Sequence, residues 1–173
     1  MNQKTDDLNY LLNVARGAIH AHCAGHPIPS CPIVHPPQPV FVSLFTQSDH
    51  RLRGCIGNLR SQETSLAQEV QKSAIAAATR DPRMEPVTME ELPSLTIEIS
   101  ILGEEEPVAS TNALNPHRWG ITVRADRRVG VLLPMVTGVE TVEQQIQIAL
   151  SKAQIATHEP YQIWRFGVQK LCE

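Results

Sequence analysis

Cysteine is scarce in this chain, and the few cysteines lie far apart. The sequence of 173 residues has four of them, at Cys23, Cys31, Cys55 and Cys172. None of them forms a Cys-x-x-Cys pair or a dense cluster, so no iron–sulfur or ribbon-type zinc signature is present. Four scattered cysteines are too few for a disulfide framework in a chain of this length. We expect reduced thiols, with no metal and no cofactor.

Basic charge, long apolar runs and a targeting segment are also missing. The formal net charge is −3 and no run of Lys or Arg occurs, so nucleic acid is not an expected partner. No apolar segment approaches about 18 residues, and the N-terminal residues lack the apolar core of a signal peptide. The sequence therefore predicts a cytoplasmic protein that does not bind membranes.

What the chain does have is enough apolar material for a real core. A length of 173 residues, with 42% hydrophobic and 19% charged residues, fits one compact domain over residues 1–173, with room for two lobes. Six prolines between residues 25 and 39 cannot sustain a helix or a central strand, so this segment is predicted to be a long surface loop.

Hydrophobic periodicity predicts three helices and six strands. Spacings of three and four predict helices from Thr5 to Ile19, from Ser65 to Asp81 and from Thr141 to Ala156. Alternating or β-branched runs predict strands at Val40–Phe45, Arg51–Ile56, Leu95–Ile101, Gly120–Arg124, Val129–Leu133 and Ile163–Val168. Hairpins and helices alternate without regular βαβ repeats, which favours an α+β fold with an antiparallel sheet flanked by helices.

The most informative motif is Leu-Arg-Gly-Cys-Ile-Gly at residues 52–57. Glycine permits φ > 0 or the close approach of another group to the backbone. Cysteine is the side chain most readily turned into a nucleophile. The spacing places Cys55 and Arg53 on one face of a predicted strand. The motif therefore indicates a site, although it does not specify a reaction.

The motif and three further segments carry a resemblance to a known family. These segments are residues 52–57, Ala76–Arg83, Leu95–Leu102 and Gly130–Pro134. In that order they resemble the AMMECR domain family, which includes AmmeMemoRadiSam system protein A. The resemblance implies an α+β domain of two unequal lobes, with the six-residue motif facing a cleft between them. It implies no established reaction, and it suggests Memo-like and radical-SAM proteins as partners by family association.

The chain departs from the family pattern near the end of its last predicted helix. It has Lys152-Ala153-Gln154 where Lys-Ala-Gly is common in the family. The departure lies far along the chain from the cysteine motif.

For Cys55 the residues leave two interpretations open. A nearby cation such as Arg53, Arg60 or Arg83 would lower the pKa of the thiol and favour a reactive thiolate. Free cysteine is also among the most buried residue types, so Cys55 could equally be a small core residue. No histidine is placed by the sequence as its base, which weakens a covalent role.

The arginines predict an anion pocket or, with similar weight, internal ion pairs. Guanidinium groups bind carboxylate and phosphate bidentately, and the amides near Gly54 and Gly57 could form a nest for an anion. The candidate ligand-binding residues are Arg53, Gly54, Gly57, Arg60, Arg83 and Glu98, with Arg80 as a further cation. Glu98 fits either a solvated strand position or a cleft carboxylate. Asp81, which precedes Pro82, is interpreted chiefly as a helix stop.

A second group of possible ligands occupies residues 20–35. It contains His20, His22, Cys23, His26, Cys31 and His35. Its spacing fits no zinc signature, so solvated histidines and half-buried cysteines explain it better.

Two hypotheses of function follow from the motif. The first is a binding module that takes a small anionic ligand or a partner peptide at the motif. The second is an enzyme or enzyme component that uses Cys55 as a nucleophile.

Overall fold

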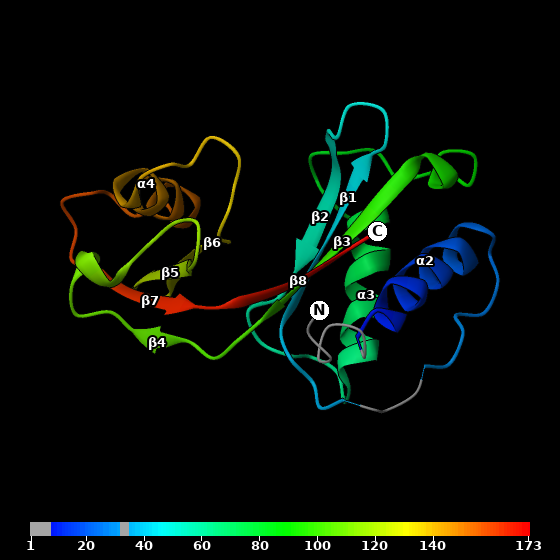
Figure 1. Ribbon diagram of the computed structural model, residues 1–173, viewed down its shortest axis with the longest axis horizontal. Helices are drawn as coiled ribbons and strands as arrows, with labels where there is room; N and C mark the ends of the chain where they lie inside the picture. Colours follow the sequence, from blue (N-terminus) through cyan, green and yellow to red (C-terminus); the bar gives the residue numbers. More distant parts are fainter. Residues whose placement is uncertain (1–7, 32–34) are drawn as a thin grey trace. The chain divides into compact units, whose positions relative to one another are not determined.

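The computed structural model describes residues 8–31 and 35–173, which form two compact units (Figure 1). The first unit contains the described residues up to Ile101 together with the C-terminal residues Gln169–Glu173. The second unit contains Leu102–Val168. The chain leaves the first unit once and re-enters it once, so the second unit is an insertion. This division agrees with the two predicted lobes.

The first unit is a four-stranded sheet with two helices on one face (Figure 1). Its elements are α2 (Tyr10–Cys23), β1 (Val40–Thr46), β2 (Leu52–Gly57), α3 (Leu66–Thr79), the short 3-10 helix η1 (Leu92–Ser94), β3 (Leu95–Leu102) and β8 (Val168–Cys172). The strand order is β2-β1-β3-β8, and β1 pairs antiparallel with both β2 and β3.

Alternation along the strands decides which face of this sheet is covered. Val42, Leu44 and Ile97 are fully buried and belong to one hydrophobic core with α2 and α3. The side chains between them point to the opposite face, because successive residues of a strand alternate. The predicted start of this helix at Ser65 is confirmed, since the Ser65 side chain caps α3 by accepting a hydrogen bond from the Gln68 amide.

The second unit has its own sheet and its own core. Its elements are β4 (Glu106–Pro107), the 3-10 helix η2 (Thr111–Ala113), β5 (Gly120–Ala125), β6 (Arg128–Leu132), α4 (Val142–Ala153) and β7 (Gln162–Phe166). The strand order is β4-β7-β5-β6, with antiparallel pairing throughout. Ile121 and Val123 of β5 pack with Ala149 and Leu150 of α4. The α+β prediction is thereby confirmed.

The structure differs from the predicted elements at three places. The predicted last strand stops at Phe166, and after Gly167 the chain continues as β8 in the sheet of the first unit. Strand β4 was not predicted, because two residues that include Pro107 give no strand pattern. The first described helix begins at Tyr10, and the predicted cap at Thr5 lies outside the described residues.

Two further predictions concern loops and membranes. The parts of the proline-rich loop that the structure describes contain neither helix nor strand, as predicted. Over residues 8–31 and 35–173, no helix is both long and apolar enough to span a membrane.

Candidate functional site

The six-residue motif forms β2, which lies at the edge of the first sheet. Both of its glycines are explained by close packing within the unit. A Cβ at Gly54 would lie 2.1 Å from the carbonyl oxygen of Ala77 in α3, and one at Gly57 would lie 2.2 Å from that of Val40. Neither glycine has a positive φ. The close approach expected at these glycines is therefore made by the chain's own backbone.

The outer edge of β2 is closed by Asp81, two residues beyond α3. The Cys55 amide donates a hydrogen bond of 2.9 Å to Asp81 Oδ2. Arg83 donates three more bonds to the same carboxylate: its amide and Nε bond to Oδ1 at 3.1 and 2.9 Å, and its Nη2 bonds to Oδ2 at 2.6 Å. The Asp81 side chain is only 1% exposed. One buried carboxylate thus holds the Cys55 backbone and the Arg83 guanidinium side by side.

The same contacts explain the charge state of this pair. The hydrogen bond from the Arg83 side chain lowers the pKa of Asp81 well below its usual range, and the amides of Cys55 and Arg83 lower it further against the effect of burial. Asp81 in turn raises the pKa of Arg83. Asp81 is therefore an anion and Arg83 a cation across the physiological range.

The thiol of Cys55 is half-buried on the sheet face opposite the helices. The Ser43 hydroxyl, from the neighbouring strand β1, donates a hydrogen bond to Cys55 Sγ at 3.2 Å. This is the one hydrogen bond made by the thiol within the part of the chain that the structure describes. A nucleophile that works by proton transfer needs a base within about 3.2 Å. The described residues supply Cys55 with a hydroxyl donor and no such base.

The polar face continues from Ser43 to the far edge of the sheet. Ser43 of β1 lies opposite Cys55 on one side and Glu98 of β3 on the other. Glu98 pairs with Lys170 of β8 at 3.1 Å and accepts a hydrogen bond from Cys172 Sγ at 3.3 Å. The Glu98 side chain is 17% exposed. Glu98 is thus held within the sheet face and is not freely solvated.

The two thiols on this face differ in their surroundings. Burial raises the pKa of Cys172 to about 11, and the hydrogen bond to Glu98 adds to the effect. Cys172 is therefore a neutral thiol at pH 7. Cys55 Sγ instead accepts a hydrogen bond from the Ser43 hydroxyl, and among the described residues it has no carboxylate partner of the kind that Cys172 has in Glu98.

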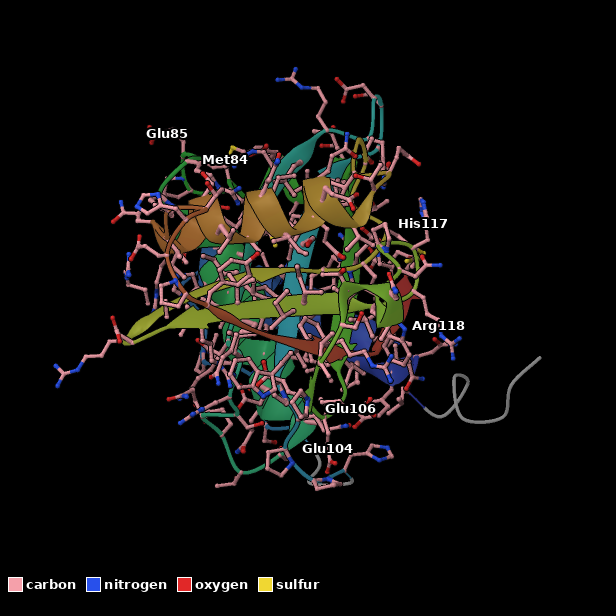
Figure 2. All side chains as sticks on the ribbon, turned by 90° about the vertical axis from the view of Figure 1, so that its left-hand side faces the viewer. Met84, Glu85, Glu104, Glu106, His117 and Arg118 are labelled. Atoms are coloured by element: carbon pink, nitrogen blue, oxygen red, sulfur yellow. The ribbon has the colours of Figure 1, made fainter. Side chains whose placement is uncertain are left out.

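The guanidinium of Arg53 forms hydrogen bonds with other residues of the chain. Its Nε and Nη2 bind the two carboxylate oxygens of Glu91 at 2.5 and 3.0 Å. Its Nη1 donates to the carbonyl of Glu85 at 2.8 Å, and Nη2 also donates to that of Pro86 at 3.4 Å. All three guanidinium nitrogens are thus engaged, and the side chain is 17% exposed. Arg53 secures the segment that follows Arg83, from which the exposed side chain of Glu85 projects (Figure 2).

Arg83 is held by a buried carboxylate and still has binding capacity left. Its side chain is 57% exposed. The hydrogen bonds to Asp81 occupy Nε and Nη2, and Nη1 has no partner within the described residues. Arg60 is exposed in the loop after β2, where its carbonyl accepts a bond from Gln62, and Arg80 is exposed at the end of α3.

The structure therefore brings together Cys55 and Arg83 from the predicted set and adds two residues to them. Sequence reasoning assigned Asp81 to stopping a helix and did not single out Ser43. The available signal for Asp81 was its place in the segment Ala76–Arg83, one of the four segments that carry the family resemblance. Ser43 gave no signal of its own, because its role follows from the register of β1 against β2.

The His- and Cys-containing segment does not assemble a metal site in its described part. Cys23 Sγ contacts the carbonyl of Val87 at 3.5 Å, and Cys31 Sγ contacts Gln71 at 3.8 Å. Burial raises the pKa of Cys23. Across residues 8–31 and 35–173, no three His, Cys, Asp or Glu side chains are grouped as metal ligands would be.

Comparison with known proteins gives one consistent result. The sequence model of a family described as AMMECR1 matches residues 12–171. A protein from Thermotoga maritima is 42% identical over 131 residues, which cover 75% of this chain and 75% of the relative. A protein from Methanocaldococcus jannaschii is 34% identical over 136 residues, covering 73% of this chain and 67% of the relative.

A longer relative and a solved structure extend the comparison. A protein from Clostridium acetobutylicum is 41% identical over 131 residues, which cover 76% of this chain but only 27% of that protein. The crystal structure of an uncharacterized protein from Pyrococcus horikoshii superposes with a TM-score of 0.84 at 27% identity, covering 95% of this chain and 90% of that one. The fold is thus shared with proteins that carry no functional description.

Proposed function

The chain belongs to the AMMECR1 family, and we propose that it is a binding module that takes a small anionic ligand beside Cys55 and Arg83. The ligand class is a carboxylate or a phosphate, because these groups match the planar guanidinium fork. Association with Memo-like and radical-SAM proteins stays a prediction from the family resemblance.

The observation that carries this proposal is the state of Arg83. An exposed arginine normally samples many rotamers, and ordering it on binding costs free energy. Here the buried carboxylate of Asp81 fixes the guanidinium through Nε and Nη2 and leaves Nη1 open. A cation that is ordered in advance binds an anion with less entropy loss. Because the negative charge of Asp81 offsets the positive charge of Arg83, we expect directional hydrogen bonds to contribute more to anion binding than net electrostatic attraction.

Thermal shift against phosphate, sulfate, acetate and citrate tests the proposal. We expect at least one of these anions to raise the Tm of the wild type, and Arg83→Ala to remove that shift. Arg60→Ala is the matched control, since Arg60 is exposed but is not held by a buried carboxylate. If no anion stabilises the wild type more than Arg83→Ala, the proposed function is wrong.

A second candidate function is supported by the hydrogen bond from Ser43. That bond holds a hydroxyl 3.2 Å from Cys55 Sγ, and the Cys55 amide shares the carboxylate of Asp81 with the Arg83 guanidinium. In this alternative Cys55 acts as a nucleophile and any base comes from the substrate or from a partner. Iodoacetamide labelling at varied pH separates the two functions. An apparent pKa of Cys55 no lower than about 8.5, the value of a free thiol, would refute the nucleophile.

A further inference from the structure

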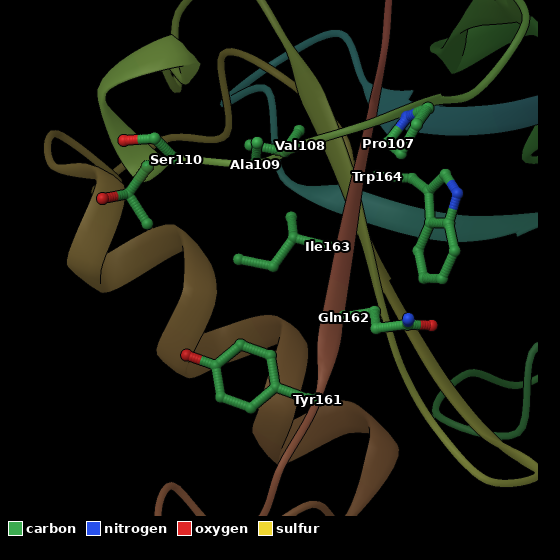
Figure 3. Close-up of a pocket in the computed structure, with 9 residues that line it drawn as sticks. Pro107, Val108, Ala109, Ser110, Tyr161, Gln162, Ile163 and Trp164 are labelled. Carbon is green, nitrogen blue, oxygen red and sulfur yellow. The ribbon is translucent and has the colours of Figure 1, made fainter.

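A pocket of about 390 Å³ lies in the second unit, which contains neither Cys55 nor Arg83 (Figure 3). Its volume is within the range of ordinary ligand sites. It is lined by residues 107–111 and 161–164, and all of them belong to the inserted unit. The described lining contains no charged side chain. The pocket therefore suits an uncharged occupant.

The pocket exists because β4 stops early. Strand β4 pairs with β7 only through Glu106 and Pro107, and the Val108 amide adds one further bond to the Ile163 carbonyl at 2.9 Å. The Ser110 side chain then caps the short helix η2 by accepting a hydrogen bond from the Asn112 amide, and the chain turns away from β7. The next position along β7 is thus left without a neighbouring strand.

That position is occupied by Tyr161. Tyr161 directly precedes β7. Because backbone groups alternate in direction along an extended chain, extending the course of β7 back by one residue turns the N–H and C=O of Tyr161 to the side on which Ile163 meets Val108. Neither group bonds to another residue within the described ranges. Unpaired backbone groups at a sheet edge are a template for another strand.

The side chains around this edge follow the alternation that strand recognition uses. Tyr161 and Ile163 point into the hollow beside Val108 and Ser110, whereas Gln162 and Trp164 point to the other side of the strand (Figure 3). The hydroxyls of Tyr161 and Ser110 lie on the same side as this hollow (Figure 3). In an added strand, the residue whose backbone pairs with Tyr161 would present its side chain on the same face as Tyr161 and Ile163.

We propose that this pocket binds an extended, uncharged peptide segment of a partner protein, which continues the line of β4 along β7. Backbone hydrogen bonds to Tyr161 supply the alignment, and the apolar floor formed by Ile163 and Val108 receives one small aliphatic side chain. This inference is independent of the proposed anion site, because no residue is shared.

The test uses the full protein and the capped tripeptide acetyl-Val-Thr-Val-amide, with binding followed by amide NMR shifts. We expect the peptide to shift the amide resonances of residues 161–164. Because so short a strand makes few contacts, we expect a Kd of about 1 mM. The same peptide N-methylated at all three residues lacks the three backbone N–H groups that strand pairing would use and should produce no such shift.

Matched variants locate the contact. Ala109→Phe fills the pocket from an exposed position and should weaken binding at least about fivefold, whereas Ala113→Phe, an exposed alanine outside the lining, should leave it unchanged. Arg83→Ala should also have no effect, so the outcome does not depend on the anion site. Absence of shifts at residues 161–164, equal binding of the N-methylated peptide, or equal binding by Ala109→Phe would each overturn the inference.

Discussion

Asp81 is the residue on which the site depends, because it holds the Cys55 backbone and the Arg83 side chain at once. Its carboxylate is buried, while the partner guanidinium is more than half exposed. Exposed ion pairs contribute little, whereas hydrogen bonds from a buried carboxylate to backbone amides contribute more. We therefore attribute the contribution of Asp81 to stability to its hydrogen bonds with the amides as much as to its charge.

Asp81→Asn should lower the free energy of unfolding by about 2 kcal/mol at pH 7, since hydrogen bonds to a charged group are lost or weakened. The difference from the wild type should depend on pH. The pKa of folded Asp81 lies below the unfolded value of about 3.9, so the carboxylate stabilises the fold above that pH and loses this effect as the pH falls toward the folded pKa.

Urea unfolding of both proteins at pH 7 and pH 3 measures this difference. We expect the gap between wild type and Asp81→Asn to narrow at pH 3. A gap of the same size at both pH values would show that the ionisation of Asp81 is not what stabilises the contact.

Arg53→Ala should act on stability and not on anion binding. The substitution removes the bidentate bond to Glu91 and the bonds to two carbonyls of the following segment, at a cost of about 1–3 kcal/mol. Urea unfolding measures the change in the free energy of unfolding, and the increase in Tm caused by an anion measures whether binding is retained. Loss of the anion shift in Arg53→Ala, with stability unchanged, would mean that Arg53 and not Arg83 contacts the ligand.

Residue roles were predictable from the sequence only in part. The sequence singled out Cys55 and Arg83 as candidates because a thiol and a guanidinium carry chemistry, and their role in binding stays a prediction. The internal use of Arg53 could not be predicted, since its partners Glu91 and the carbonyl of Glu85 lie more than thirty positions away. A guanidinium has the same sequence signature whether it binds a ligand or a neighbouring segment.

At the scale of elements, the contact between β2 and α3 positions the motif. Gly54 lets the strand backbone approach the Ala77 carbonyl, and the alanine-rich face of α3 completes the fit. This close approach brings the end of α3, and with it Asp81, to the edge of β2.

Gly54→Ala should therefore destabilise the protein by about 1–3 kcal/mol, as overpacking does, because its Cβ would overlap the helix backbone. The matched control is Gly17→Ala inside α2, where nothing lies within 4 Å of an added Cβ. In that control the free energy of unfolding should rise by about 0.5–1 kcal/mol, because alanine has a better helix propensity than glycine. Equal effects of the two substitutions in thermal unfolding would contradict the packing account.

The end of α4 carries a strained residue. Gln154 adopts a left-handed conformation with φ 55° directly after the last residue of α4. This conformation costs a residue with a Cβ about 1–2 kcal/mol. Gln154→Gly should raise Tm and stabilise the protein by about 1 kcal/mol, whereas Gln154→Ala retains the Cβ and should give no such gain. A lower Tm for Gln154→Gly than for Gln154→Ala would refute this explanation.

The positions of most helices and strands were predictable, because hydrophobic periodicity and helix-capping residues can be read from short stretches of sequence. The alternation of Leu95, Ile97 and Ile99 identified β3, and Ser65 identified the start of α3. Strand β8 was missed because its residues alternate between the core, which takes Leu171, and the polar face, which takes Lys170. A short strand with one core side chain has no apolar pattern to detect.

At the scale of the whole molecule, one unit is inserted between two neighbouring strands of the other. Strands β3 and β8 are adjacent in one sheet, and the entire second unit lies between them in sequence. Each unit has its own hydrophobic core. The sequence indicated two lobes through the family resemblance, but it could not show which strands share a sheet, because pairing over such a separation leaves no local pattern.

The central claim is that an anion binds beside Cys55 on the Arg83 guanidinium, and an NMR titration with inorganic phosphate tests it most directly. Wild-type protein labelled with nitrogen-15 should show phosphate-dependent shifts of the Cys55 amide and of Arg83 Nε, and Arg83→Ala should lose the shift at Cys55. Phosphate shifts confined to other residues, or a Cys55 shift that persists in Arg83→Ala, would contradict the account.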